Sequence, residues 1–189
     1  MSDINQLISI IIPVYNETES IGFLLDEVIS VMKANKLHFE LIVVNDGSKD
    51  NTLQVLKELT IKIKELVVIS LRKNYGQTAA MSAGFDNSNG DIIITLDGDL
   101  QNDPNDIPKL ISEINKDYDL ICGWRFDRKD KLINRKIPSK IANKLIAKVT
   151  GLKLHDYGCS LKAFKKEIVD DIKLYGELHR FLPVLANIE

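Results

Sequence analysis

Short apolar runs rich in β-branched residues alternate with longer segments of helical periodicity over the first 123 residues, and this alternation constrains the fold most. The runs expected to be strands are 7–13, 39–45, 66–71, 91–96 and 118–123. The segments expected to be helices are 19–35, 51–64, 76–87 and 105–116. Parallel neighbouring strands need a crossover connection, so the order predicts an α/β fold: a mostly parallel central sheet with helices on both faces.

Beyond residue 125 the pattern changes to a basic loop, a helix expected over 136–150, a strand near 160–164 and helical pieces up to 187. No internal repeat or Gly/Ser-rich linker divides the 189 residues, which is the size of one domain with a large core. We therefore expect a single domain over residues 1–189. Ser48 or Asp50 is the expected cap of the second helix, and Asn105 or Asp106 that of the fourth.

Charge and cysteine content exclude some partners and suggest a compartment. The 25 basic and 27 acidic residues give a net charge of −2, which predicts no nucleic-acid partner. Cys122 and Cys159 are isolated, and no charged-then-apolar leader precedes the first strand, so we expect reduced thiols in a cytosolic compartment. No run approaches the roughly 18 apolar residues of a membrane span.

Polar residues follow each of the five predicted strands. These clusters are 13–17 (PVYNE), 45–48 (NDGS), 72–76 (RKNYG), 97–99 (DGD) and 124–125 (WR). One cluster alone is equally well explained as a turn or a helix cap, because Asn, Asp, Gly and Ser favour turns for local reasons. Five clusters at the carboxyl edge of one parallel sheet, where ligands of such sheets bind, predict a binding site there.

The carboxylates that end the fourth strand predict a cation. Asp97 and Asp99 are one residue apart, so in an extended segment both side chains project from the same face and repel each other unless a cation or proton intervenes. With the amide oxygen of Gln101 they are hard oxygen donors suited to Mg²⁺ or Mn²⁺, which complete their shells with water and phosphate oxygens. The pattern therefore predicts a divalent ion that holds a diphosphate.

Other chemistries lose support from what the sequence lacks. It contains no G-x-S-x-G elbow, no G-x-x-x-x-G-K-[ST] phosphate loop and no G-x-G-x-x-G after the first strand. Its three histidines, His38, His155 and His179, are far apart, so a zinc site would need long-range assembly. Hydrolase, P-loop ATPase and dehydrogenase interpretations are therefore disfavoured.

Taken together, the motifs resemble glycosyltransferase family 2, specifically the branch of dolichyl-phosphate mannose synthase and bacterial polyprenyl-phosphate glycosyltransferases. The resemblance is carried by ISIIIPVYNETESI, VVNDGSKDNT, RKNYGQTAAMSAGF, TLDGDLQNDP, GWRFDRKDKLINRKIPSK, HDYGCSLKAF and ELHRFLPVLA. It implies the nucleotide-diphospho-sugar transferase (GT-A) fold. It also implies a metal-dependent, inverting transfer of a hexose, from a donor of the UDP-glucose or GDP-mannose type, to undecaprenyl or dolichyl phosphate.

The resemblance also implies roles for individual residues. Nucleotide-binding positions are Pro13, Tyr15, Glu17, Asp46 and Asp97; metal positions are Asp97, Asp99 and Gln101; acceptor-phosphate positions are Arg125, Arg135 and Ser139; catalytic positions are Asp156 and Asp99. Family members of this branch continue with membrane helices that these 189 residues lack, so we expect a catalytic domain shortened at its C-terminus, acting at the cytoplasmic face of the membrane. A homo-oligomer is left open.

The acceptor can also be argued from charge. Residues 125–148 hold nine basic and two acidic residues, and four of the lysines recur every fourth position between 136 and 148. This basic segment is either a solvated helix face or a surface for anionic lipid headgroups and a phosphate acceptor. A phosphate monoester, with a second pKa near 6, needs little help from a base, whereas a sugar hydroxyl needs one.

Alternatives remain at this stage. Asp156 fits a base, a group that orients an arginine, or a turn residue before Gly158. Two other functions compete with transfer to a lipid phosphate: a glycosyltransferase acting on a saccharide hydroxyl in cell-surface polysaccharide synthesis, and an inactive nucleotide-binding scaffold. The Q-x-x-R-W motif usual in processive relatives is absent, which disfavours the first.

Overall fold

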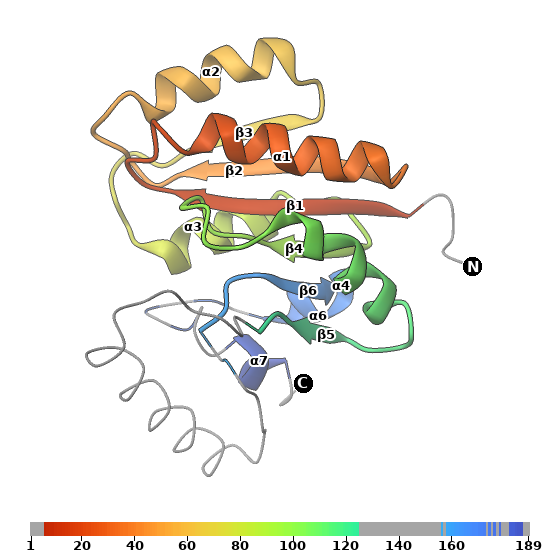
Figure 1. Ribbon diagram of the computed structural model, residues 1–189. Coiled ribbons are helices and arrows are strands. Elements are labelled where there is room, and N and C mark those ends of the chain that lie inside the picture. The colour runs from red at the N-terminus through yellow and green to blue at the C-terminus, as the bar shows by residue number, and fades with distance from the viewer. Residues whose placement is uncertain are drawn as a thin grey trace, which may run out of the picture.

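A six-stranded sheet forms the centre of the structure, a computed structural model that describes residues 6–124, 156, 158–172, 174, 176, 178 and 182–186. The strands are β1 (Leu7–Val14), β2 (His38–Asn45), β3 (Leu66–Ser70), β4 (Ile92–Thr95), β5 (Leu120–Cys122) and β6 (Lys162–Lys165). Their order across the sheet is β3-β2-β1-β4-β6-β5 (Figure 1). The strands β1 to β4 are parallel, and β6 is antiparallel to both β4 and β5.

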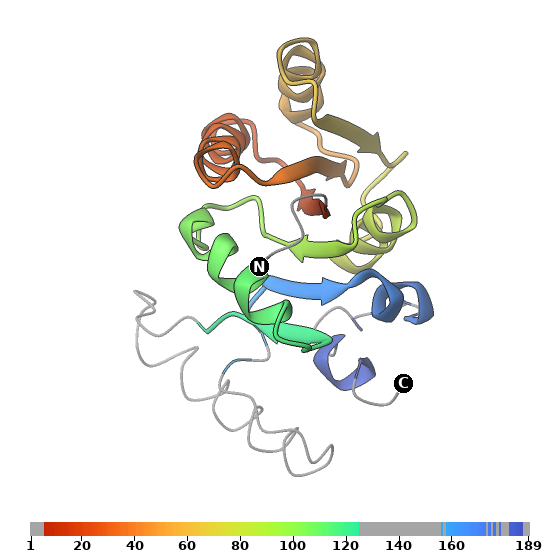
Figure 2. The same cartoon turned by 90° about the vertical axis from the view of Figure 1, so that its right-hand side faces the viewer.

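Helices cover both faces of this sheet, as the alternation predicts. The helices are α1 (Ile21–Ala34), α2 (Thr52–Lys62), α3 (Gln77–Asp86), α4 (Ile107–Ile114), α6 (Lys166–Asp171) and α7 (Leu182–Leu185), with a 3₁₀ turn, η1, at Pro104–Asp106. One face packs against α1, α2 and α4, and the other against α3, α6 and α7, so Figure 2 shows α1 and α4 across the sheet from α3 and α6.

Alternate residues of the central strands supply these two cores, because successive side chains of a strand point to opposite faces. In β1, Ile10 and Ile12 pack towards α1, whereas Ile11 packs towards α3. All three are fully buried. A strand buried on both faces is mostly apolar, which is why β1 reads as a nearly continuous apolar run rather than an alternating one. Its one polar residue, Ser9, is fully buried and donates a hydrogen bond to Glu40 Oε1.

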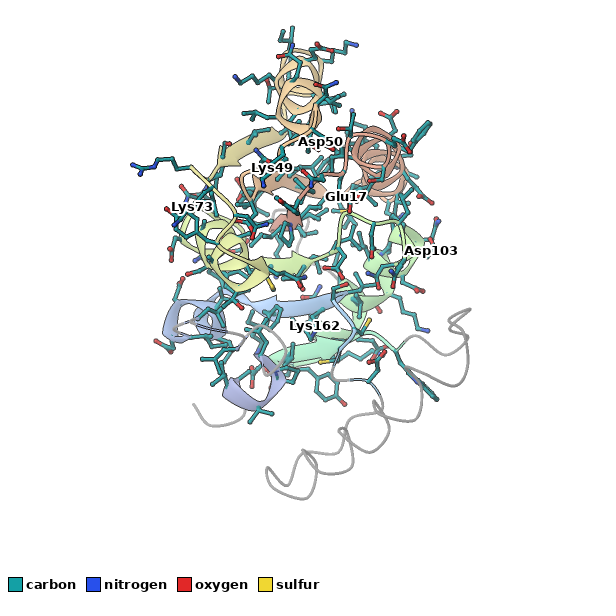
Figure 3. All side chains as sticks on the ribbon, turned by 90° about the vertical axis from the view of Figure 1, so that its left-hand side faces the viewer. Glu17, Lys49, Asp50, Lys73, Asp103 and Lys162 are labelled. Atoms are coloured by element: carbon teal, nitrogen blue, oxygen red, sulfur yellow. The ribbon has the colours of Figure 1, made fainter. Side chains whose placement is uncertain are left out.

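The insertion of β6 sets the geometry of the sheet edge where the polar clusters lie. Because β6 is antiparallel to β4 and β5, these two strands run in the same direction, and the carboxyl ends of β1 to β5 all face one edge. The first residue of β6, Lys162, lies at that edge, paired with Thr95 of β4 and Cys122 of β5. Figure 3 looks onto this edge, with Lys162 labelled below Glu17 and Asp50.

The N-cap of α4 agrees with expectation, whereas that of α2 differs. Asn51, not Ser48 or Asp50, is the N-cap of α2 and makes no side-chain cap bond, while Asp50 Oδ1 accepts from the N–H of Thr52 at 3.0 Å. At α4 the expected Asp106 is the N-cap, although its side chain makes no cap bond. One turn earlier, Asp103 accepts from the N–H of Asn105 at 2.9 Å and starts η1. Aspartate is an excellent cap wherever it can reach an unpaired N–H, so local spacing alone does not fix which one caps.

The helix expected over 136–150 lies outside the described residues. Within them, the structure contains no helix of the length and apolarity that crossing a bilayer requires.

Candidate active site

A cavity of about 280 Å³ opens at the carboxyl edge of the sheet, where the loops after β1, β2, β3 and β4 meet. Its lining residues are Pro13, Val14, Tyr15, Glu17, Asp46, Asn74, Gly76, Gln77, Ala80, Asp97, Gly98 and Asp99. All five predicted nucleotide positions and two of the three predicted metal positions are therefore brought together. Gln101 and Asp156 do not line this cavity, and Arg125, Arg135 and Ser139 lie outside the described residues.

The loops after β1 and β2 are held to each other by hydrogen bonds. The N–H of Asn16 donates to Ser48 Oγ at 2.9 Å, and the N–H of Lys49 donates to Asn16 Oδ1 at 2.8 Å. The N–H of Glu17 donates to Thr52 Oγ1 at 2.8 Å. Because these bonds join both loops, Tyr15 and Glu17 keep a fixed position relative to the start of α2.

Asp50 strengthens this junction from outside the cavity. Its carboxylate accepts from the hydroxyls of Thr18 at 2.6 Å and Thr52 at 2.5 Å, and from both of their N–H groups. Desolvation raises the pKa of Asp50, but these hydrogen bonds to the charged form outweigh it and lower the pKa to about 2. The carboxylate is thus a structural acceptor that joins the β1–α1 loop to α2.

Asp46 fixes the third loop. Its side chain is 3% exposed, and its two oxygens accept from the N–H of Tyr75 at 2.7 Å and of Gly76 at 2.8 Å. Gly47 follows with φ of +63°, and a Cβ there would lie 2.3 Å from the carbonyl carbon of Lys73. The β3–α3 loop therefore crosses directly over Gly47, where only glycine leaves room for it.

This loop adds site residues that the sequence reasoning did not assign, Asn74 and Gln77. Nε2 of Gln77, the first residue of α3, donates to Asp97 Oδ1 at 2.7 Å. The polar run RKNYGQ was a signal that this loop belongs to the site, but nothing in it indicated that Gln77 contacts the fourth strand's carboxylate. That contact orients the Asp97 carboxylate within the cavity.

The acidic loop after β4, residues 97–102, packs closely on β1. A Cβ at Gly98 would lie 2.8 Å from Val14 Cγ1, so a larger residue would push the loop away from β1. Asp97 is half-buried and Asp99 is exposed, and Asp99 Oδ1 accepts from the N–H of Gln101 at 3.2 Å. The Gln101 side chain is exposed.

The donors of this loop suit one class of metal. Among the described residues no group of three or more His, Cys, Asp or Glu could enclose an ion. Two aspartates at the mouth of a cavity instead match the way Mg²⁺ and Mn²⁺ bind, through one or two carboxylates with water and substrate phosphates completing the shell. The residues present therefore fit a divalent cation shared with a diphosphate.

Two thiols, a carboxylate and an amine lie beside the acidic loop. They come from β5, from β6 and from the residues before β6. Asp156 is 9% exposed and accepts from the N–H of Gly158 at 3.1 Å, while Lys162 is 3% exposed and donates to the carbonyl of Cys159. Burial lowers the pKa of Lys162, whereas the electrostatic attraction of Cys122, Cys159, Asp97 and Asp156 opposes that shift. Burial raises the pKa of the Cys122 thiol to about 11, which makes it a poor nucleophile.

Comparisons with known proteins agree with this geometry. The model of the family described as "Glycosyl transferase family 2" matches residues 9–173. A dodecaprenyl-phosphate galacturonate synthase of Rhizobium johnstonii is 49% identical over 93% of this chain and 53% of its own length. An undecaprenyl-phosphate 4-deoxy-4-formamido-L-arabinose transferase of Proteus mirabilis is 42% identical over 95% of this chain and 55% of its own length. The chain thus spans about half the length of these curated relatives.

Solved structures support the fold. A mycobacterial protein aligns with a TM-score of 0.73 at 23% identity, covering 96% of this chain and 60% of that one. Glucosyl-3-phosphoglycerate synthase from Mycobacterium tuberculosis, in complex with Mn²⁺, UDP and phosphoglyceric acid, aligns with a TM-score of 0.67 at 21% identity, covering 87% and 57%. The predicted GT-A fold is confirmed.

Proposed function

The chain belongs to glycosyl transferase family 2, and from this premise we propose that it transfers a sugar from a nucleotide-sugar donor to a polyprenyl phosphate. The observation that carries the proposal is the convergence of Asp46, Asp97 and Asp99, from the ends of two strands, on one cavity. The two relatives above are named for polyprenyl-phosphate acceptors, which supports the choice of acceptor.

On the donor side, we assign the nucleoside to the part of the cavity formed by Pro13, Tyr15, Glu17 and Asp46. The diphosphate then lies towards Asp97 and Asp99. A divalent cation bound by these two carboxylates would stabilise the negative charge that develops on the leaving diphosphate. Gln77 donates to Asp97 Oδ1 and thereby orients this carboxylate towards the proposed diphosphate position.

In the proposed step an oxygen of the lipid phosphate attacks the anomeric carbon, the bond from that carbon to the diphosphate breaks, and a nucleoside diphosphate departs. The acceptor is ionised at neutral pH, so the step needs no proton transfer to Asp156. We keep Asp156 as a proposed catalytic-site residue beside the acidic loop, and Arg125, Arg135 and Ser139 as the proposed receptors of the acceptor phosphate.

The donor sugar is open. UDP-glucose and GDP-mannose were the sequence-based expectation, whereas the two relatives are named for galacturonate and 4-deoxy-4-formamido-L-arabinose. A donor panel should therefore include uronic acid and modified pentose nucleotides beside hexoses. We also propose that residues 1–189 form one catalytic domain and that the whole protein works at the cytoplasmic face of the membrane.

The test is release of nucleoside diphosphate by the protein that carries this chain, measured across the donor panel with Mn²⁺ or Mg²⁺ and with undecaprenyl phosphate. We expect release that depends on both the metal and the lipid phosphate, and its loss in Asp99→Asn. Asp103→Asn, at an exposed aspartate outside the cavity, is the matched control. Oligosaccharides outperforming lipid phosphates would favour a polysaccharide-forming enzyme, and metal-independent nucleotide binding without turnover would favour an inactive scaffold.

A further inference from the structure

The acidic loop is joined to the segment 156–162, which carries Asp156, through the side chain of Asn102. This amide is 8% exposed, and both of its ends are used. Nδ2 donates to Ser160 Oγ at 2.7 Å, and Oδ1 accepts from the thiol of Cys159 at 3.7 Å. One side chain therefore contacts two consecutive residues that are 57 and 58 positions away in sequence.

The backbone carbonyls of the same two residues are bound by the last residue of β4 and the first residue of β6. Thr95 Oγ1 donates to the carbonyl of Ser160 at 2.6 Å, and Lys162 Nζ donates to the carbonyl of Cys159. No buried side-chain nitrogen or oxygen of the described residues lacks a hydrogen-bond partner. These polar groups satisfy one another, an arrangement that specifies one geometry. We call them the clamp, which consists of Thr95, Asn102, Cys159, Ser160 and Lys162.

The clamp joins the loop that carries Asp97 and Asp99 to the segment that carries Asp156. Asn102 follows Asp99 by three residues, and Ser160 follows Asp156 by four. Between Asp99 and Asn102 the loop is exposed, and Leu100 has a φ of +61°. The acidic loop is thus exposed at its tip and anchored at its far end by Asn102.

We propose that Asn102 is a positioning residue for transfer, which fixes the acidic loop against residues 158–162 and so holds Asp99 at the cavity, with Asp156 beside the loop. The inference rests on the proposed function. Carboxylates brought together repel, so neutral hydrogen bonds at the base of both segments are needed to hold them in place before substrates arrive. Misplacement of reacting groups by about 1 Å can cost on the order of 100-fold in rate.

The kinetic test uses Asn102→Ala, Ser160→Ala and their double variant, with Asn105→Ala as control. Asn105 is exposed, and its side-chain amide bonds only to Asp103 within its own turn among the contacts described. We expect Asn102→Ala to lower kcat about 10- to 100-fold while the donor KM changes less than about 3-fold. The double variant should cost about as much as Asn102→Ala alone, because Ser160→Ala removes a contact that Asn102→Ala already removes.

A conservative variant and a measurement without substrates separate positioning from folding. Ser160→Thr keeps the hydroxyl and should retain most of the activity. By amide hydrogen exchange of the ligand-free protein, Asn102→Ala should exchange faster in 97–102 and 158–162 but not in the central strand β1. Faster exchange throughout the sheet would mean general destabilisation and would overturn the inference, as would a kcat equal to that of Asn105→Ala. Absence of transfer by the unchanged protein would instead overturn the proposed function, whereas the exchange result would still report on the clamp.

Discussion

Replacing Asp46 by Asn exchanges one carboxylate oxygen for an NH₂ group and tests whether the β3–α3 loop is held by a carboxylate. Both oxygens of Asp46 accept a backbone N–H, from Tyr75 at 2.7 Å and from Gly76 at 2.8 Å. An asparagine offers only one oxygen, so its NH₂ group must face the other N–H. The NH₂ group then faces a backbone N–H, donor against donor, at a residue that is only 3% exposed.

The magnitude follows from the two losses. A hydrogen bond to a charged group contributes about 1.5 to 3 kcal/mol, and leaving a buried N–H without an acceptor costs about 1 to 3 kcal/mol. The two costs are not fully additive, because the N–H that loses its acceptor can form a hydrogen bond to water if the loop moves outward. We therefore expect Asp46→Asn to lower the free energy of unfolding by about 2 to 4 kcal/mol.

The assay is urea denaturation followed by circular dichroism, with amide exchange of Tyr75 and Gly76 as the local readout. The control is Asp103→Asn, because the exposed Asp103 caps η1 through a single oxygen that asparagine retains, and we expect a loss below about 0.5 kcal/mol. This prediction is wrong if the free energy of unfolding of Asp46→Asn lies within about 0.5 kcal/mol of that of the unchanged protein and both amides stay protected from exchange. In that case the two hydrogen bonds do not hold the loop.

Three further predictions concern the same edge of the sheet. Gly47→Ala should destabilise the fold by about 2 kcal/mol or more by urea denaturation, because it combines a left-handed backbone with a clash against the next loop; an unchanged midpoint would contradict this. Asp50 has its folded pKa lowered from 3.8 to about 2, so its stabilisation is present above pH 4 and is lost as the pH falls towards 2. The stability difference between the unchanged protein and Asp50→Asn should shrink over that range, and a constant difference would refute the assignment. Gln77→Ala should raise about 10-fold the Mn²⁺ concentration that gives half-maximal release of nucleoside diphosphate, because Asp97 loses its bond to Gln77. Gln54→Ala, at an exposed pair on α2, should leave this concentration unchanged.

Much of the fold could be predicted because its signals are local. A run such as residues 7–13 is apolar except for Ser9 because it is buried on both faces of a parallel sheet, and the helices between such runs follow their own period. The position of the site followed from the same rule, since strands that run in one direction end at one edge. Asp46, Asp97 and Asp99 therefore line one cavity, as the order of the elements implied.

The order of the strands is not local. The short strand expected near 160–164 could have joined either end of the sheet, and only the tertiary structure places β6 antiparallel between β4 and β5. That placement brings Lys162 beside Thr95 and Cys122, and segment 156–162 beside the acidic loop.

The sequence by itself determined which segments are strands and helices, and which polar clusters follow them, because side-chain periodicity and turn chemistry act over a few residues. The tertiary structure alone decided which side chains hold these clusters in place. Gln77 contacts Asp97 across 20 positions, Asp46 holds the loop at Gly76 across 30, and Asn102 reaches Ser160 across 58. Such contacts depend on how whole elements pack, and no pattern in a short window of sequence encodes that packing.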